Sequence, residues 1–159
     1  MILNKQLGVF LNFVHNRFKK YLTAFFQESG YNITPEQFLL LDALWDMGVM
    51  PQQKIADTML KDKNSVVKLV DALEKKGLVR RGVSSHDRRQ NLIEVTPRGL
   101  EIKDGVTAAA IKAVDLITKD ISREDLHIFL NVLFNMSENM NGDVNLLKTD
   151  NTKDYGKII

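Results

Sequence analysis

The sequence predicts a mainly helical α+β fold, in which helices at both ends of the chain flank two short helices and a β-hairpin. Apolar residues recur every three or four positions through most of the 159 residues, which is the period of a helix face. Proline and glycine mark the starts and ends of these periodic segments. Two short segments, 78–83 and 91–95, interrupt the pattern and have the composition of strands.

The composition limits the classes of protein that this chain can belong to. Without cysteine, it has no disulfide, cysteine nucleophile or thiol redox sensor. Apolar runs such as 38–41 are far shorter than the roughly 20 residues needed to span a bilayer. Asn12, His15 and Arg17 interrupt any signal-peptide core near the N-terminus. We therefore expect a cytoplasmic protein with no membrane partner.

Two helices are predicted before residue 50. The first spans residues 2–28 and ends at Gly30, and its apolar face carries Leu3, Leu7, Phe10, Val14, Phe18, Tyr21 and Phe25. Thr34, Pro35 and Gln37 then form an N-cap, a first-position proline and a capping-box glutamine. They begin a second helix, which ends at Gly48.

The next two predicted helices are short and close together. One spans 52–60 after Pro51, and the other spans 64–76, with Gly77 at the left-handed position that ends it. The polar break 61–63 joins them, as in a helix-turn-helix. Many helical hairpins share this spacing, so the pair is only moderately specific by itself.

A basic hairpin follows directly. The polar loop 84–90 joins its two strands, and a hairpin in this place is a wing, so we predict a winged helix-turn-helix with a two-stranded wing. Residues 54–98 carry eleven Lys/Arg against six Asp/Glu, although the whole chain has a formal net charge of only +2. Positive charge concentrated in this way suits a phosphate-binding surface.

The rest of the chain predicts two more helices. Thr96 and Pro97 begin one that carries Leu100, Val106, Ala110, Ala113 and Ile117 on its apolar side, and Ser122 caps a last helix that reaches Met140. Residues 142–159 are polar and aperiodic, and we predict a flexible tail there.

Residues 3–140 resemble the MarR family of bacterial transcriptional regulators. Three segments carry the resemblance by their order and spacing: Ser65 to Arg81, then Asp87-Arg88-Arg89, then Val95-Thr96-Pro97-Arg98-Gly99. The family's helix-turn-helix often begins with a Ser or Thr cap, where this chain has Met50-Pro51.

The resemblance implies an obligate homodimer that binds double-stranded DNA at a pseudo-palindromic operator. The N- and C-terminal helices, in residues 1–34 and 98–141, are then a dimerisation bundle, and residues 35–97 are the DNA-binding domain. We accordingly expect a sequence-specific transcriptional regulator, and a repressor whose DNA affinity is modulated by a small-molecule effector.

The DNA-binding candidates lie in the two motif helices and the wing. They are Lys54, Lys61, Lys63, Asn64, Ser65, Lys68, His86, Arg88 and Arg89. A helix fits the major groove, where Asn pairs with adenine and Lys contacts guanine or phosphate. The alternative for these residues is an ordinary solvated helix face.

In the wing, a guanidinium suits a narrow, electronegative minor groove. The resemblance suggests that Asp87 fixes one arginine or the turn while the other enters the groove. Whether Arg88 or Arg89 is the reader stays open, with Arg89 favoured. The alternative is a charged, exposed turn. Arg80 and Arg81 alternate along a strand, so only one of them is expected to face DNA.

The resemblance also implies a small aromatic or phenolic effector in a crevice between bundle and winged domain. By analogy, Phe10, Phe13, Val14, Arg17 and Trp45 are candidate lining residues, although aromatic residues at helical spacing are more often core. Effector control rests on the family analogy and not on a motif.

Two other function classes remain. An enzyme is not expected, because no phosphate loop, serine elbow or paired-carboxylate signature is present. No cofactor or metal is expected either, because His15, His86 and His127 lack metal-ligand spacing. A protein-interaction module with the same fold is the stronger alternative, and the basic middle segment argues against it.

Overall fold

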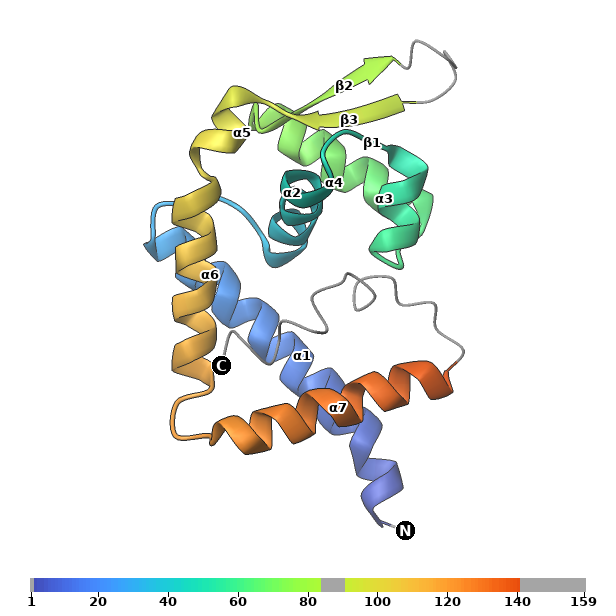
Figure 1. Ribbon diagram of the computed structural model, residues 1–159, viewed down its shortest axis with the longest axis vertical. Helices are drawn as coiled ribbons and strands as arrows, with labels where there is room; N and C mark the ends of the chain where they lie inside the picture. The colour runs from blue at the N-terminus through green and yellow to red at the C-terminus, as the bar shows by residue number, and fades with distance from the viewer. Residues whose placement is uncertain (1, 84–90, 141–159) are drawn as a thin grey trace.

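The protein has a mainly helical α+β fold, which confirms the predicted fold class (Figure 1). The computed structural model describes residues 2–83 and 91–140. Their elements, in chain order, are α1 (Ile2–Glu28), α2 (Pro35–Met47), β1 (Met50–Pro51), α3 (Gln52–Thr58), α4 (Lys63–Lys75), β2 (Val79–Val83), β3 (Asn91–Val95), α5 (Pro97–Glu101), α6 (Lys103–Ile117) and α7 (Arg123–Asn139).

The predicted helix starts are confirmed by their caps. Thr34 Oγ1 accepts a hydrogen bond from the Gln37 N–H at 3.3 Å, and Gln37 Oε1 accepts one from the Thr34 N–H at 3.1 Å. This capping box satisfies two backbone donors at the start of α2. Thr96 and Ser122 cap α5 and α7 by a single bond each, which their hydroxyl oxygens accept from the Gly99 and Asp125 N–H groups. Gly77 has φ +69°, the left-handed conformation expected after α4.

The sheet has one strand more than the predicted two-stranded wing. Its order is β1-β3-β2, and both pairs are antiparallel. In β1, Met50 pairs with Ile93 and Pro51 with Leu92. A strand of two residues, one of them a proline at a sheet edge, is too short to produce an alternating pattern. The missed strand therefore exists through its pairing with β3.

The single helix predicted after Thr96 is also wrong in one respect, because the chain divides it at Ile102 into α5 and α6. Gly99 holds α5 against the sheet so closely that an added Cβ would lie 2.2 Å from the Leu78 carbonyl oxygen. Helix α6 packs against α1, and Gly105 of α6 lies close to the ring of Tyr31 in the loop after α1. The break at Ile102 lies between these two contacts.

The core lies mainly within a unit that we call the head, formed by α2, α3, α4, the sheet and α5. Its fully buried side chains include Leu40, Leu41, Ile55, Val66, Val70, Leu73 and Ile93. Leu22 and Phe26 of α1 and Val106 and Ala113 of α6 join the same cluster. The head is therefore attached to the C-terminal half of α1 and to α6.

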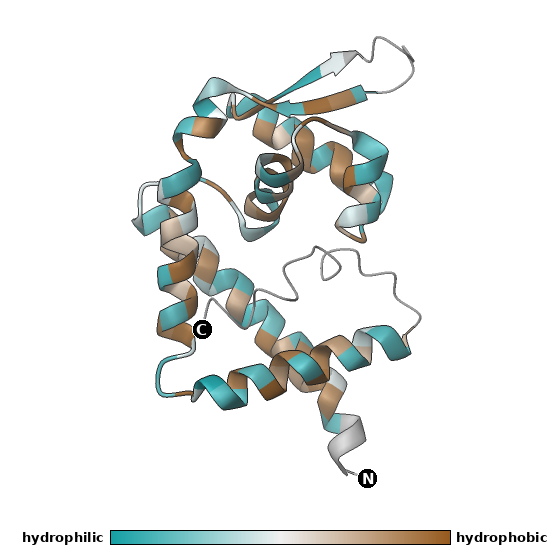
Figure 2. Ribbon diagram, viewed as in Figure 1, coloured by the Kyte–Doolittle hydropathy of each residue, from teal (hydrophilic) through white to brown (hydrophobic). Residues whose placement is uncertain are grey.

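The outer helices α1, α6 and α7 carry much apolar surface that this chain does not cover. Figure 2 shows hydrophobic residues along all three. Helix α7 has no buried residue, and Phe129 is 51% exposed. In α1, Phe10 is 60% exposed. No helix within residues 2–83 and 91–140 is long and apolar enough to cross a membrane.

Candidate nucleic-acid interface

Helix α4 is divided into a buried side and a polar side. Val66, Val70 and Leu73 are buried in the head. Lys63, Asn64 and Lys68 are exposed on the other side, around the start of the helix. The buried side fixes the rotation of the helix, so these three polar side chains point away from the core.

Asp62 caps α4, whereas the sequence pattern predicts only a polar break at 61–63. Its Oδ1 accepts a hydrogen bond from the Ser65 N–H at 2.9 Å, and its Oδ2 accepts one from the Ser65 hydroxyl. The hydrogen bond from the Ser65 hydroxyl is the main cause that lowers the pKa of Asp62. The Ser65 hydroxyl proton is therefore engaged, and its oxygen remains available as an acceptor. The signal for this cap was an Asp three residues before Ser65.

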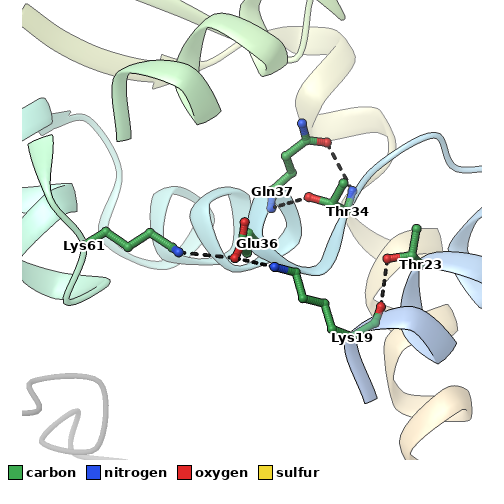
Figure 3. Close-up of polar contacts among 6 residues, drawn as sticks. All are labelled: Lys19, Thr23, Thr34, Glu36, Gln37 and Lys61. Carbon is green, nitrogen blue, oxygen red and sulfur yellow. Dashed lines mark hydrogen bonds and ion pairs between the residues drawn. The ribbon is translucent and has the colours of Figure 1, made fainter. Parts of the chain in front are cut away.

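The other lysines proposed from the two motif helices have different surroundings. Lys54 is exposed on α3. Lys61 is half-buried in the turn between α3 and α4, and its Nζ lies 3.2 Å from Glu36 Oε1 (Figure 3). Lys61 is thus held in an ion pair, whereas Lys54 makes none with the described residues.

The two arginines at the base of the wing are both paired with acids. Arg81 bonds to Asp71 and Glu74 of α4. Burial acts to lower the pKa of Arg81, but these two carboxylates outweigh it and raise the pKa. Arg81 therefore ties β2 to α4, which the sequence could not reveal because the partners lie seven and ten residues away on another element.

Arg80 points to the opposite face, as strand alternation predicts. Its Nε lies 2.5 Å from Glu94 Oε1, on the residue directly opposite in β3. The hydrogen bond to Glu94 raises the pKa of Arg80. Its side chain is largely exposed, so this pair adds little stability and leaves the guanidinium accessible.

The predicted wing-tip residues His86, Asp87, Arg88 and Arg89 lie outside the described residues. The strands that carry their loop end at Val83 and begin again at Asn91. Figure 1 shows β2 and β3 extending from the head on the side away from α7.

The candidate effector residues lie in two parts of the molecule. In α1, Phe10, Phe13 and Val14 are exposed, and the Arg17 guanidinium lies 5.6 Å from the centre of the Phe13 ring. Trp45 is half-buried at the edge of the head core, where its ring packs against Phe38.

The Trp45 indole also donates a hydrogen bond to the Gly99 carbonyl at 3.2 Å. Trp45 therefore packs as an ordinary core residue, the alternative to ligand binding. The three apolar residues of α1 are exposed and do not belong to the core. Within residues 2–83 and 91–140, no group of three or more acidic or histidine side chains could hold a metal ion.

Comparison with known sequences finds a match to one family. The model of the MarR family matches residues 33–90, from the start of α2 to the wing. Over these residues the chain is similar to the MarR family. A curated relative is the HTH-type transcriptional regulator MhqR of Bacillus subtilis, 27% identical over 103 residues, which are 65% of this chain and 71% of MhqR.

Solved structures share the MarR-family fold. A probable transcriptional regulator from Pseudomonas aeruginosa is 25% identical, with a TM-score of 0.76 over 84% of this chain and 98% of the other. A mutant MarR from E. coli complexed with operator DNA is 19% identical, with a TM-score of 0.76 over 86% and 98% of the two chains.

A third structure is Bordetella bronchiseptica BpsR, whose DNA binding is regulated by 6-hydroxynicotinic acid. It is 21% identical, with a TM-score of 0.74 over 82% of this chain and 91% of BpsR. The matched family and these neighbours are transcriptional regulators and not enzymes. By these similarities the chain is a transcriptional regulator.

Proposed function

We propose that this MarR-family regulator is a homodimer that binds a pseudo-palindromic site in double-stranded DNA and represses transcription. The observation that carries DNA reading is the orientation of α4. Its apolar side is fixed in the head, and its polar side presents Lys63, Asn64 and Lys68 at the N-terminal end. The N-terminal residues of such a helix are those that meet base edges in the major groove.

Each exposed side chain has a chemical part in this proposal. The Asn64 amide can pair with adenine, and the ammonium groups of Lys63 and Lys68 can bind guanine or phosphate. Ser65 can accept a hydrogen bond, and Lys54 on α3 reaches the flanking phosphates. In the wing, Arg88 or Arg89 enters the minor groove and His86 contacts phosphate. Arg81 braces the wing against α4 through Asp71 and Glu74.

The outer helices support the dimer. Helix α7 buries none of its residues, although Ile128, Phe129 and Val132 are apolar. A contiguous exposed apolar face of this kind marks an interaction surface. A second copy that interleaves α1, α6 and α7 covers it. We therefore assign residues 1–34 and 98–141 to dimerisation and residues 35–97 to DNA binding.

We also propose that a small aromatic or phenolic effector changes the DNA affinity. The regulation of BpsR by 6-hydroxynicotinic acid supports this proposal, and so does the pairing of Arg17 with Phe13, which offers a cation beside an apolar ring. An effector shifts the equilibrium only by its difference in affinity between the two states of the regulator. The regulator acts on DNA in the cytoplasm, without catalytic activity of its own.

The test is the selection of bound duplexes from a randomised pool, followed by affinity measurements on the selected site at several salt concentrations. The wild type should enrich an inverted repeat with half-sites about one helical turn apart. Asn64→Ala should relax the base preference at a cost of about 1–3 kcal/mol. If Lys68 contacts phosphate, Lys68→Met should weaken all sites evenly and reduce the log-log salt slope by about 0.9.

Lys20→Met is the matched control, because Lys20 is an exposed lysine of α1 outside the head. It should change neither the base preference nor the salt slope. If no duplex is enriched at low salt, the DNA-binding proposal is wrong and the protein-interaction module takes its place.

A further inference from the structure

Both ends of α4 are bonded to the first turn of α2. Lys61, directly before the capping Asp62, donates from Nζ to Glu36 Oε1 at 3.2 Å. Lys76, directly after α4, donates from Nζ to Gln37 Oε1 at 2.8 Å and to the Asn32 carbonyl at 2.6 Å. Two consecutive residues of α2 therefore hold the helix that carries the polar side chains.

The same turn of α2 is bonded to α1. Lys19 Nζ donates to Glu36 Oε1 at 2.8 Å, so one carboxylate oxygen accepts from both lysines. Figure 3 shows Lys19 and Lys61 reaching Glu36 from opposite sides. A single side chain thus links the long outer helix to the turn that precedes α4.

Several effects keep Glu36 ionised. The hydrogen bond from Lys19 is the largest cause that lowers the pKa of Glu36, and Lys61 adds to it against the opposing effect of burial. Glu36 also lies in the first turn of α2, where the helix dipole favours a negative charge. Its side chain is 33% exposed, so the two ion pairs add little to stability. Their larger consequence is geometric, because they restrict how α4 can move relative to α1.

We infer that Glu36 is a positioning residue that couples α1 to α4 and thereby sets the half-site spacing that the dimer accepts. The inference rests on the proposed function, in which α1 belongs to the dimer and α4 reads DNA. Lys61 then acts through Glu36 and not through a phosphate. This separates Lys61 from Lys54 and Lys68, whose side chains are exposed.

The experiment compares Glu36→Gln, Lys19→Met and Lys61→Met with the control Lys20→Met. Each full-length variant is first checked for wild-type helix content by circular dichroism. Its affinity is then measured for the selected site and for two versions whose half-sites are moved apart or together by one base pair. All measurements are repeated over a range of salt concentrations.

We expect the three variants to lose roughly two- to fivefold of the discrimination between spacings, the range that half-exposed ion pairs can supply. Their salt slopes should equal that of the wild type, and combining any two should cost less than the sum of both. Lys20→Met should behave as the wild type. A drop of about 0.9 in the salt slope of Lys61→Met alone would assign Lys61 to phosphate and overturn the inference. Unchanged discrimination in all three variants would overturn it as well.

A second measurement needs no DNA. Lys19→Met and Lys61→Met are combined in a double-mutant cycle of urea unfolding, in the wild type and in the Glu36→Gln background. The coupling energy between Lys19 and Lys61 should be measurable when residue 36 is the wild-type Glu and absent in the Glu36→Gln background. If coupling is present but no DNA is bound, the proposed function fails while the link between α1 and α4 stands. If coupling is absent from both, the link itself is wrong.

Discussion

The head and the outer helices show the same helical spacing of apolar residues but use it differently. In the head, Leu41 and Val66 are fully buried within the chain. In the outer helices, Phe10 and Phe129 are more than half exposed, and α7 buries nothing. Periodicity predicts that a helix has an apolar face but not which surface covers that face. The head closes on itself, whereas the outer helices leave apolar faces uncovered, which the proposed dimer would cover.

The largest expected effect lies in the head. Leu41→Ala removes a side chain that is fully buried and leaves a cavity, which should lower the free energy of unfolding by about 2–5 kcal/mol. Leu39→Ala is the matched control, since Leu39 is 50% exposed on the same helix. Urea unfolding followed by fluorescence checks this, because Trp45 is the single tryptophan of the chain and lies in the head. Equal losses in both variants would contradict the buried and exposed assignments.

The next effect separates the two regions. Phe129→Arg places a charge on the exposed apolar face of α7 and should weaken the dimer by about 2 kcal/mol or more, as for a residue central to an interface. Sedimentation should show monomer at concentrations where the wild type is dimeric. Trp45 fluorescence should still report a folded head. Asn131→Arg is the control for added charge on α7, and an equal loss of dimer in this variant would place the interface elsewhere.

A smaller effect, an increase in the free energy of unfolding, is expected from a change in the turn between α3 and α4. Leu60 has φ +49°, a conformation that costs a branched side chain about 1 kcal/mol or more, and its side chain is 62% exposed. Leu60→Asn should therefore raise the free energy of unfolding by roughly 0.5–1 kcal/mol, because Asn tolerates this conformation. Leu60→Ala keeps a Cβ without the polar group and should give no such gain. A decrease for Leu60→Asn would mean that the packing of the Leu60 side chain outweighs the cost of its backbone conformation.

The smallest effect concerns Asp42 of α2. Burial raises the pKa of Asp42, and repulsion by Asp46 adds to this, so the fold favours the protonated carboxyl. The protonated Asp42 carboxyl contributes to the free energy of unfolding. This contribution is fully present below the pKa of Asp42 in the unfolded chain, near 4, and is lost as the pH rises through the higher pKa of the folded state. Asp42→Asn should thus be slightly more stable than the wild type at pH 7 and lose that advantage toward pH 3. Thermal unfolding across this range tests it, with Asp115→Asn on α6 as the exposed control.

Most of the fold could be predicted because its signals are local. Thr34, Pro35 and Gln37 fall within four residues and define the start of α2, and the αL glycine after α4 is adjacent to the helix that it ends. The polar side of α4 also follows from local spacing, since Lys63, Asn64 and Lys68 alternate with residues that must be buried. These candidates needed no knowledge of distant contacts.

The missed strand β1 and the missed break at Ile102 involve residues far apart in the chain, unlike the Asp62 cap, whose partner Ser65 is three residues away. β1 exists because Met50 and Pro51 pair with β3. The break at Ile102 lies between two close packing contacts, one at Gly99 and one at Gly105. No pattern within a few residues encodes either of them, and a straight helix was the reasonable prediction.

By itself, the sequence determined where most helices begin and end, which of their faces are apolar, and which segment concentrates positive charge. These depend on backbone caps and side-chain periodicity within one element. The tertiary structure alone decided which charges are engaged. Lys61 pairs with Glu36 and Arg81 with Asp71, whereas Lys63 and Lys68 stay exposed on the polar side of α4. A lysine looks the same in sequence whether its ammonium meets a carboxylate or water, because an ion pair is set by the distance between elements that only the packed core fixes.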